Sequence, residues 1–254
     1  MRIQTLLMTA AALAAGVISS QAQGTVYSQN VVGYVNISIP AHASQMIANQ
    51  LDTGSNTLDN VFQGTGLSST KTEVLEWNGA GYNVYTYLNC SASPSSPGVA
   101  GFWNATQTAE VGATNYLQPG QGIFVLNGSA STATIPTVGQ VVQGTNVYTV
   151  AAGANIYSVP QPLAGLPIDQ SPVNFPVVST KTEYLQWTGS GYNTYTYLNC
   201  SASPTSPGQA GFWNATQTID EDTNPAAWPV AGGSFFILNG AGHSLTWTNV
   251  FEVQ

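Results

Sequence analysis

Residue types that commonly perform catalysis are few in this sequence of 254 residues. It contains two histidines, His42 and His243, and no Gly-x-Ser-x-Gly motif. A Ser-His-Asp site needs a histidine held between a nucleophile and a carboxylate. Glycoside hydrolysis needs two acids that flank one cleft, whereas Glu73 and Glu183 occupy equivalent places in two different halves of the chain. We therefore predict no catalytic residues and no enzymatic activity.

A short acidic run near the C-terminus is the candidate metal site. Asp220, Asp222 and Asn224 place oxygen-bearing side chains at alternate positions, a pattern that can hold Ca²⁺. The run lacks the downstream bidentate glutamate of a complete calcium loop, and the corresponding residues 109–112 lack the run itself. A weak calcium site and a solvated loop are the two interpretations, and no other cofactor is expected.

Aromatic side chains are the candidate ligand-binding groups. If exposed, their rings could stack on the faces of sugars, and if buried, they would fill the space between sheets. The two tryptophans of this set are the better ligand candidates, because each follows a loop rich in Ser, Pro and Gly. The candidate carbohydrate-binding residues are Trp103, Trp213, Tyr85, Tyr87, Tyr195 and Tyr197.

Each half of the chain also contains one cysteine and one lysine. We expect Cys90 and Cys200 to form a disulfide if the two halves face each other across a pseudo-two-fold axis. Free thiols and an intermolecular bond are the alternatives. Lys71 and Lys181 each share a strand face with a glutamate, which predicts surface ion pairs or, if the lysines are buried, cross-links to asparagine.

An internal repeat positions all these residues. Residues 69–108 and 179–218 are identical at 33 of 40 positions, at an offset of 110. Five of the seven differences fall at even positions between 74 and 84, whereas Leu75 and Trp77 are unchanged in the second copy. This period of two predicts strands at 71–78 and 181–188, with the unchanged residues facing inward. Asn78-Gly79-Ala80-Gly81 predicts a hairpin turn before a return strand at 82–88.

The remaining segments are short apolar runs separated by Ser, Thr, Asn, Gly and Pro, and only 57–62 predicts a helical turn. The fold class is therefore all-β, with two tandem antiparallel β-sandwich domains at 23–143 and 144–254. Similar strands at 30–33, 140–143 and 250–254 give one boundary strand more than there are units. The terminal strands are expected to pair within the chain or to add to the sheet edge of a second copy.

Composition and the N-terminus define the setting. Three basic residues against eleven acidic ones exclude nucleic-acid binding and a polybasic membrane surface, and 43% hydrophobic residues exclude disorder. Arg2, the apolar residues 6–18 and Ser20-Gln21-Ala22 form a secretory signal cleaved after Ala22. We expect the mature chain to be exported to the extracellular space or cell surface, or to the periplasm, without inserting into a membrane.

Four segments carry a resemblance: Val26 to Val35, Met46 to Leu51, Trp77 to Tyr82 and Pro119 to Val125. In this order they resemble a group of exported proteins of unknown function from Verrucomicrobia-type bacteria. The Pro-Gly-Gln-Gly element is also similar to β-sandwich modules near the C-termini of secreted Bacteroidetes surface proteins, although Ala231-Gly232-Gly233-Ser234 replaces it in the second unit. The resemblance implies an extracellular module without catalysis.

Together these observations predict a structural or adhesive protein of the cell surface or matrix. Its expected partners are itself or other surface components. The alternative is a pair of carbohydrate-binding modules that bind polysaccharide through exposed aromatic rings.

Overall fold

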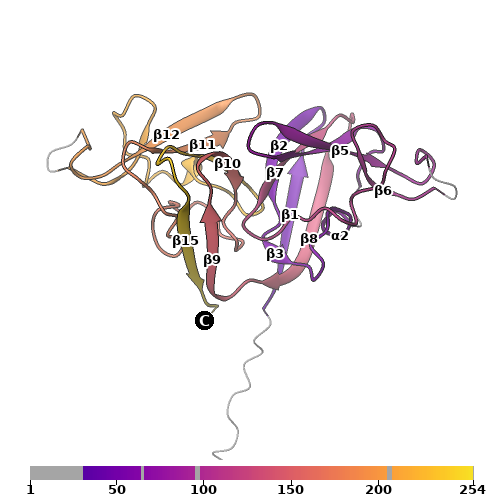
Figure 1. Ribbon diagram of the computed structural model, residues 1–254, viewed down its shortest axis with the longest axis horizontal. Helices are drawn as coiled ribbons and strands as arrows, with labels where there is room; N and C mark the ends of the chain where they lie inside the picture. Colours follow the sequence, from indigo (N-terminus) through magenta and orange to yellow (C-terminus); the bar gives the residue numbers. More distant parts are fainter. Residues whose placement is uncertain (1–30, 64–65, 95–97, 205–207, 254) are drawn as a thin grey trace, which may run out of the picture. The chain divides into compact units, whose positions relative to one another are not determined.

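The computed structural model describes residues 31–63, 66–94, 98–204 and 208–253 (Figure 1). The expected signal peptide, residues 1–22, lies outside the described residues. In the part that is described, no helix has the length and apolarity needed to cross a membrane.

The described chain is all-β, and its strands form several antiparallel sheets, which confirms the prediction of an all-β chain with antiparallel pairing. One five-stranded sheet contains, in spatial order, β2 (Ala43–Ala48), β7 (Gly122–Asn127), β4 (Thr72–Trp77), β5 (Tyr82–Leu88) and β6 (Gly101–Asn104). A second sheet contains β10 (Gly153–Tyr157), β14 (Phe235–Asn239), β11 (Thr182–Trp187), β12 (Tyr192–Leu198) and β13 (Gly211–Asn214). The two sheets have equivalent strand orders, as the sequence repeat requires.

Two smaller sheets complete the strands. One contains β1 (Val32–Ile39), β8 (Ala133–Val141) and β3 (Leu51–Asp52), and the other contains β15 (Leu245–Phe251) and β9 (Gly144–Val150). Figure 1 shows β1 beside β8 and β15 beside β9. The first and last strands of the described chain therefore both pair within the same chain. This agrees with the first of the two expectations for the terminal strands, pairing within the chain.

Among the described residues, two short helices interrupt the strands. Helix α2 (Leu58–Val61) begins after Thr57, whose hydroxyl accepts a hydrogen bond from the Asn60 amide at 3.3 Å. This confirms the helical turn predicted at 57–62. A 3-10 helix, η1 (Pro225–Ala227), begins after Asn224, whose side chain accepts a hydrogen bond from the Ala226 amide at 3.2 Å.

The predicted hairpin is also confirmed. Strands β4 and β5 pair in the register Trp77↔Tyr82. In the turn, Asn78 Oδ1 accepts hydrogen bonds from the amides of Ala80 and Gly81 at 3.1 and 2.9 Å. Gly79 has a φ of +92°, which favours glycine. Strands β11 and β12 repeat the hairpin in the register Trp187↔Tyr192.

The prediction of which hairpin face is buried was incomplete, because the face predicted to be solvated is also buried. Val74 and its counterpart Tyr184, at a position where the repeats differ, are both almost fully buried. Tyr184 belongs to the core cluster of the second repeat, which also contains Trp228, Phe235 and Trp247. The even-numbered face is therefore not solvated but covers the core of each repeat. Because a core tolerates exchanges between hydrophobic residues when its neighbours adjust, this face can differ between the repeats.

The unchanged residues on the other face form a contact between the two repeats. Leu75, Trp77, Leu185 and Trp187 pack against a cluster made of Met46, Phe124, Ile156 and Phe236. The contacts within this cluster come in equivalent pairs: the Trp77 indole donates to the Ala154 carbonyl at 2.6 Å, and the Trp187 indole donates to the Ser44 carbonyl at 3.0 Å. Such self-complementary pairing is what a two-fold relation produces.

The same relation orders the aromatic rings. Phe124 lies 5.3 Å from Trp187, and Phe236 lies 5.5 Å from Trp77, between ring centroids. Phe124 and Phe236 lie 6.4 Å apart between ring centroids, and Tyr82 and Tyr192 lie close enough for each side chain to affect the pKa of the other. We call this set of contacts between equivalent residues the inter-repeat contact.

The expected disulfide is wrong, because Cys90 and Cys200 are free and exposed. Equivalent residues meet only if they lie on the pseudo-two-fold axis. Tyr82 and Tyr192, at the start of β5 and β12, are close together, but the cysteines follow eight residues later. At ~3.3 Å per residue, an extended strand moves each cysteine by ~25 Å from that point.

These thiols give a direct prediction. We expect the folded, unreduced protein to react with a thiol reagent at both cysteines, since both are exposed. Thiol counting before and after denaturation should give the same value of two per chain. A value near zero in both states would contradict the structure.

Candidate functional site

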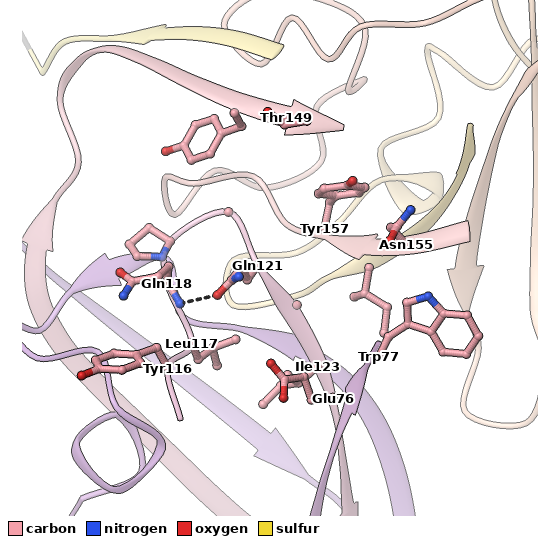
Figure 2. A pocket seen from close by; sticks show the side chains of 15 residues that line it. Glu76, Trp77, Tyr116, Leu117, Gln118, Gln121, Ile123, Thr149, Asn155 and Tyr157 are labelled. Atoms are coloured by element: carbon pink, nitrogen blue, oxygen red, sulfur yellow. Dashed lines mark hydrogen bonds between the residues drawn. The ribbon is translucent and has the colours of Figure 1, made fainter. Parts of the chain in front are cut away.

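The candidate site is a cleft of about 350 Å³ that residues of both repeats line. Glu76 and Trp77 come from the end of β4, and Ile123 comes from β7. Tyr148 comes from β9, and Asn155 and Tyr157 come from β10. Figure 2 shows Glu76 and Ile123 on one side of the cleft and Asn155 and Tyr157 on the other.

The loop that precedes β7 completes the cleft and contains the Pro-Gly-Gln-Gly element. The Gln118 amide donates to Gln121 Oε1 at 2.8 Å, the bond drawn in Figure 2. The loop is joined to the second repeat, because the Ser158 amide donates to the Gly120 carbonyl at 3.0 Å and its hydroxyl to the Gln121 carbonyl at 3.1 Å. These bonds hold the loop in a fixed position against β10.

Glycine is required at two positions of this loop. Gly120 has a φ of +95°, which side chains rarely adopt. At Gly122 a Cβ atom would lie 2.4 Å from Cβ of Ser234 and 2.5 Å from Cγ2 of Ile156. The motif in the sequence is therefore a packing element between the repeats, and its glycines allow the close approach.

Glu76 is the carboxylate of the cleft. The Tyr85 hydroxyl donates a hydrogen bond to Glu76 Oε2 at 2.8 Å. Burial, together with this carboxylate, raises the pKa of Tyr85 to about 12, so Tyr85 stays a neutral donor. The bond orients the carboxylate of Glu76, which is partly exposed.

Aromatic rings form much of the remaining wall. Tyr116 is 53% exposed, whereas Trp77, Tyr148 and Tyr157 are partly buried. The hydroxyl of Tyr157 accepts a hydrogen bond from the Ala151 amide at 2.9 Å, which fixes its ring. Burial raises the pKa of both Tyr148 and Tyr157. The cleft thus combines rings with the amides of Gln118, Gln121 and Asn155.

The pseudo-two-fold relation produces a second, smaller cleft of about 190 Å³. Here Gln186 and Trp187 stand at the places of Glu76 and Trp77. The Gln186 amide is already bonded, because its Nε2 donates to the Ala226 carbonyl at 2.8 Å and its Oε1 accepts from the Tyr195 hydroxyl at 3.3 Å. Val230 and Gly233 replace Gln118 and Gln121, so the second cleft lacks the two loop amides of the first.

The structure corrects the predicted carbohydrate platform. Trp103 and Trp213 are only 3% and 2% exposed, so a sugar has no access to their rings. Tyr85 and Tyr195 are also buried. Tyr87 and Tyr197 are partly exposed, but their rings pack against Phe102 and Phe212 at 5.7 and 5.5 Å. These residues belong to the cores, and the aromatic rings of the cleft are a different set.

The predicted calcium ligands have structural partners instead. Asp222 Oδ1 accepts from the Phe212 amide, and Asp220 Oδ1 accepts from the Asp222 amide, both at 3.0 Å. Asn224 caps η1. Within the described residues, no group of three or more His, Cys, Asp or Glu side chains is placed to hold a metal ion.

Asp169 lies next to this acidic run. No sequence pattern joins Asp169 to the run, and the sequence did not predict it as a site residue. Burial and the charges of Asp222 and Asp220 raise the pKa of Asp169 to about 7. Asp169 Oδ1 and Asp220 Oδ2 are both buried without a hydrogen-bond partner among the described residues. The acidic cluster of Asp169, Asp220 and Asp222 therefore concentrates negative charge in a partly buried place.

The corresponding part of the first repeat has one carboxylate fewer. There Asp59, the counterpart of Asp169, accepts from the Phe102 amide at 3.0 Å. Gly112 stands at the place of Asp222, and a Cβ atom at Gly112 would lie 2.0 Å from Asp59 Oδ1. There is room for only one aspartate carboxylate beside the amide of Phe102 or Phe212. In the second repeat Asp222 accepts from this amide, and Asp169 lies elsewhere.

The lysines are exposed, and among the described residues neither forms an ion pair. The buried lysine that a cross-link to asparagine needs is therefore not present. No family model, no curated protein and no solved structure matches this chain.

Proposed function

We propose that this chain is a non-catalytic exported protein of the cell surface or extracellular matrix, and that it adheres to polysaccharide through the cleft lined by Glu76 and Trp77. The observation that carries the proposal is the composition of the cleft. Aromatic rings and amide side chains line one hollow, and rings for stacking with amides for hydroxyl groups suit a polyhydroxylated ligand.

Two further observations support this proposal. The cleft is held by hydrogen bonds between the repeats, from the Ser158 hydroxyl and the Trp77 indole to backbone carbonyls, so its shape is largely formed before a ligand binds. Its ring Tyr116 is also exposed to solvent, as a stacking residue must be. We further propose that residues 23–143 and 144–254 are two sandwich domains, each formed by a five-stranded sheet facing one of the smaller sheets.

Replacing Tyr116 by alanine tests the function. We expect the variant to bind a soluble oligosaccharide about 5-fold more weakly, because a ring–sugar contact contributes about 1 kcal/mol. Binding is measured by calorimetry against a panel of neutral and amino-sugar oligosaccharides. The free energy of unfolding should change little, since the ring is half exposed.

The matched control is Tyr34→Ala. Tyr34 is 63% exposed on β1 and does not line the cleft. Binding should be unchanged in this variant. The proposal fails if no oligosaccharide binds, or if both tyrosine variants weaken binding equally.

A further inference from the structure

We propose that the cleft selects glycans that carry a protonated amine, such as de-N-acetylated amino sugars, and that Glu76 is the residue that determines this specificity. This inference rests on the proposed function, since it names the class of polysaccharide. It is carried by the placement of a single carboxylate among aromatic rings.

Among the described residues, Glu76 has no cationic partner. In the part of the chain that the structure describes, no lysine or histidine forms an ion pair with it, and the Tyr85 hydroxyl donates a hydrogen bond to its Oε2. The carboxylate is held in the wall of the cleft while remaining partly exposed. An oriented carboxylate without a partner can accept a charge-assisted hydrogen bond from a ligand ammonium group.

The rings strengthen the preference for a cation. Trp77, Tyr148, Tyr157 and Tyr116 line the same hollow as Glu76. The face of an aromatic ring attracts a cation, most strongly for tryptophan. A neutral sugar would use the rings for stacking only, whereas an amino sugar would use both the rings and the carboxylate.

The charge of the whole chain acts in the same direction. Three basic and eleven acidic residues give a formal net charge of −8. This charge repels acidic polysaccharides and attracts cationic ones, more strongly at low salt. Uronic-acid polymers are therefore the least suitable ligands for this cleft.

The second cleft serves as an internal comparison. Gln186 replaces Glu76 there, is neutral, and has both ends of its amide in hydrogen bonds. Its Oε1 accepts from Tyr195 as Glu76 accepts from Tyr85. The fold thus accommodates glutamine at this position, and Glu76→Gln removes the charge without removing the contact to tyrosine.

The experiment compares a glucosamine oligosaccharide with the N-acetylglucosamine oligosaccharide of equal length, by calorimetry at a pH where the amine is protonated. We expect the wild-type protein to bind the glucosamine form about 10-fold more tightly. Glu76→Gln should weaken binding of the glucosamine form more than that of the acetylated form and reduce the ratio to about 2–3, the preference that the rings and the net charge still contribute. Glu252→Gln, which removes the same charge at an exposed position, should retain the preference.

The other outcomes separate the two proposals. Equal wild-type affinity for both oligosaccharides would overturn the inference and leave the glycan-binding function standing. Binding of neither these nor the other oligosaccharides of the panel would overturn the function and the inference with it. A lysine-containing peptide that binds more tightly than the glucosamine form, and loses affinity in Glu76→Gln, would overturn the assignment to amino sugars.

Discussion

Replacing Phe124 by alanine is expected to lower the free energy of unfolding by about 3–5 kcal/mol, the usual effect of truncating a buried phenylalanine. Phe124 is only 7% exposed, and its ring contacts Trp187, Phe236 and Tyr82 at centroid distances of 5.3, 6.4 and 5.9 Å. Truncation would leave a cavity in the middle of the inter-repeat contact. Chemical denaturation followed by tryptophan fluorescence measures the loss.

The equivalent residue gives a matched test of the pseudo-two-fold relation. Phe236 makes the corresponding contacts with Trp77 and Tyr192 at 5.5 and 5.8 Å. We therefore expect Phe236→Ala to destabilise by a similar amount. The double variant should lose less than the sum of the two, because the residues contact each other. Full additivity, or a loss below about 1 kcal/mol in either single variant, would contradict the contact.

The second large effect is a dependence of stability on pH. Burial and the charges of Asp222 and Asp220 raise the pKa of Asp169 from 3.8 to about 7. The folded state therefore binds a proton that the unfolded state releases, and stability falls as pH rises from about 4 to about 7. Since Asp169 is largely buried, we expect a loss of about 2–4 kcal/mol over this window.

Asp169→Asn separates this carboxyl from the others. The variant should be more stable than wild type at pH 7.5 and should show a smaller rise in melting temperature on acidification to pH 4.5. Some dependence should remain, because burial also raises the pKa of Asp59, to about 6, and that of Asp222. Glu252→Gln is the control at an exposed site. A wild-type melting temperature that rises with pH through this window would contradict the assignment.

Local signals predicted the local structure well. The Asn78 to Gly81 turn, the strands on either side and the helical turn after Thr57 all depend on neighbours in sequence, and the structure confirms them. The faces of the hairpin could not be assigned in the same way. A period of two shows that two faces differ, but it does not show which face is covered by which part of the chain.

The repeat did contain the missing signal. Leu75 and Trp77 are unchanged in the second copy, because a pseudo-two-fold contact places the same residues on both sides. Val74 and Tyr184 differ, because each faces only its own core. At these positions, the same residue in both repeats therefore indicated a place in the inter-repeat contact, and not simply a buried side chain.

The candidate site was the least predictable feature. Glu76 and Tyr157 lie 81 positions apart in the sequence and in different repeats, so no motif joins them. The one local signal was the Pro-Gly-Gln-Gly element, which the first repeat has and the second lacks. That difference marks the side on which the larger cleft lies.

The inter-repeat contact also bears on how the two clefts came to differ. In a symmetric pair of identical chains, every substitution occurs twice, so a change that fills one cleft also fills the other. When both copies are joined in a single polypeptide, each can mutate independently. Gln186 and Val230 could then arise in one cleft while Glu76 and Gln118 persisted in the other. Covalent linkage thus allows the two clefts, although the same pseudo-two-fold relation produces both, to carry different side chains.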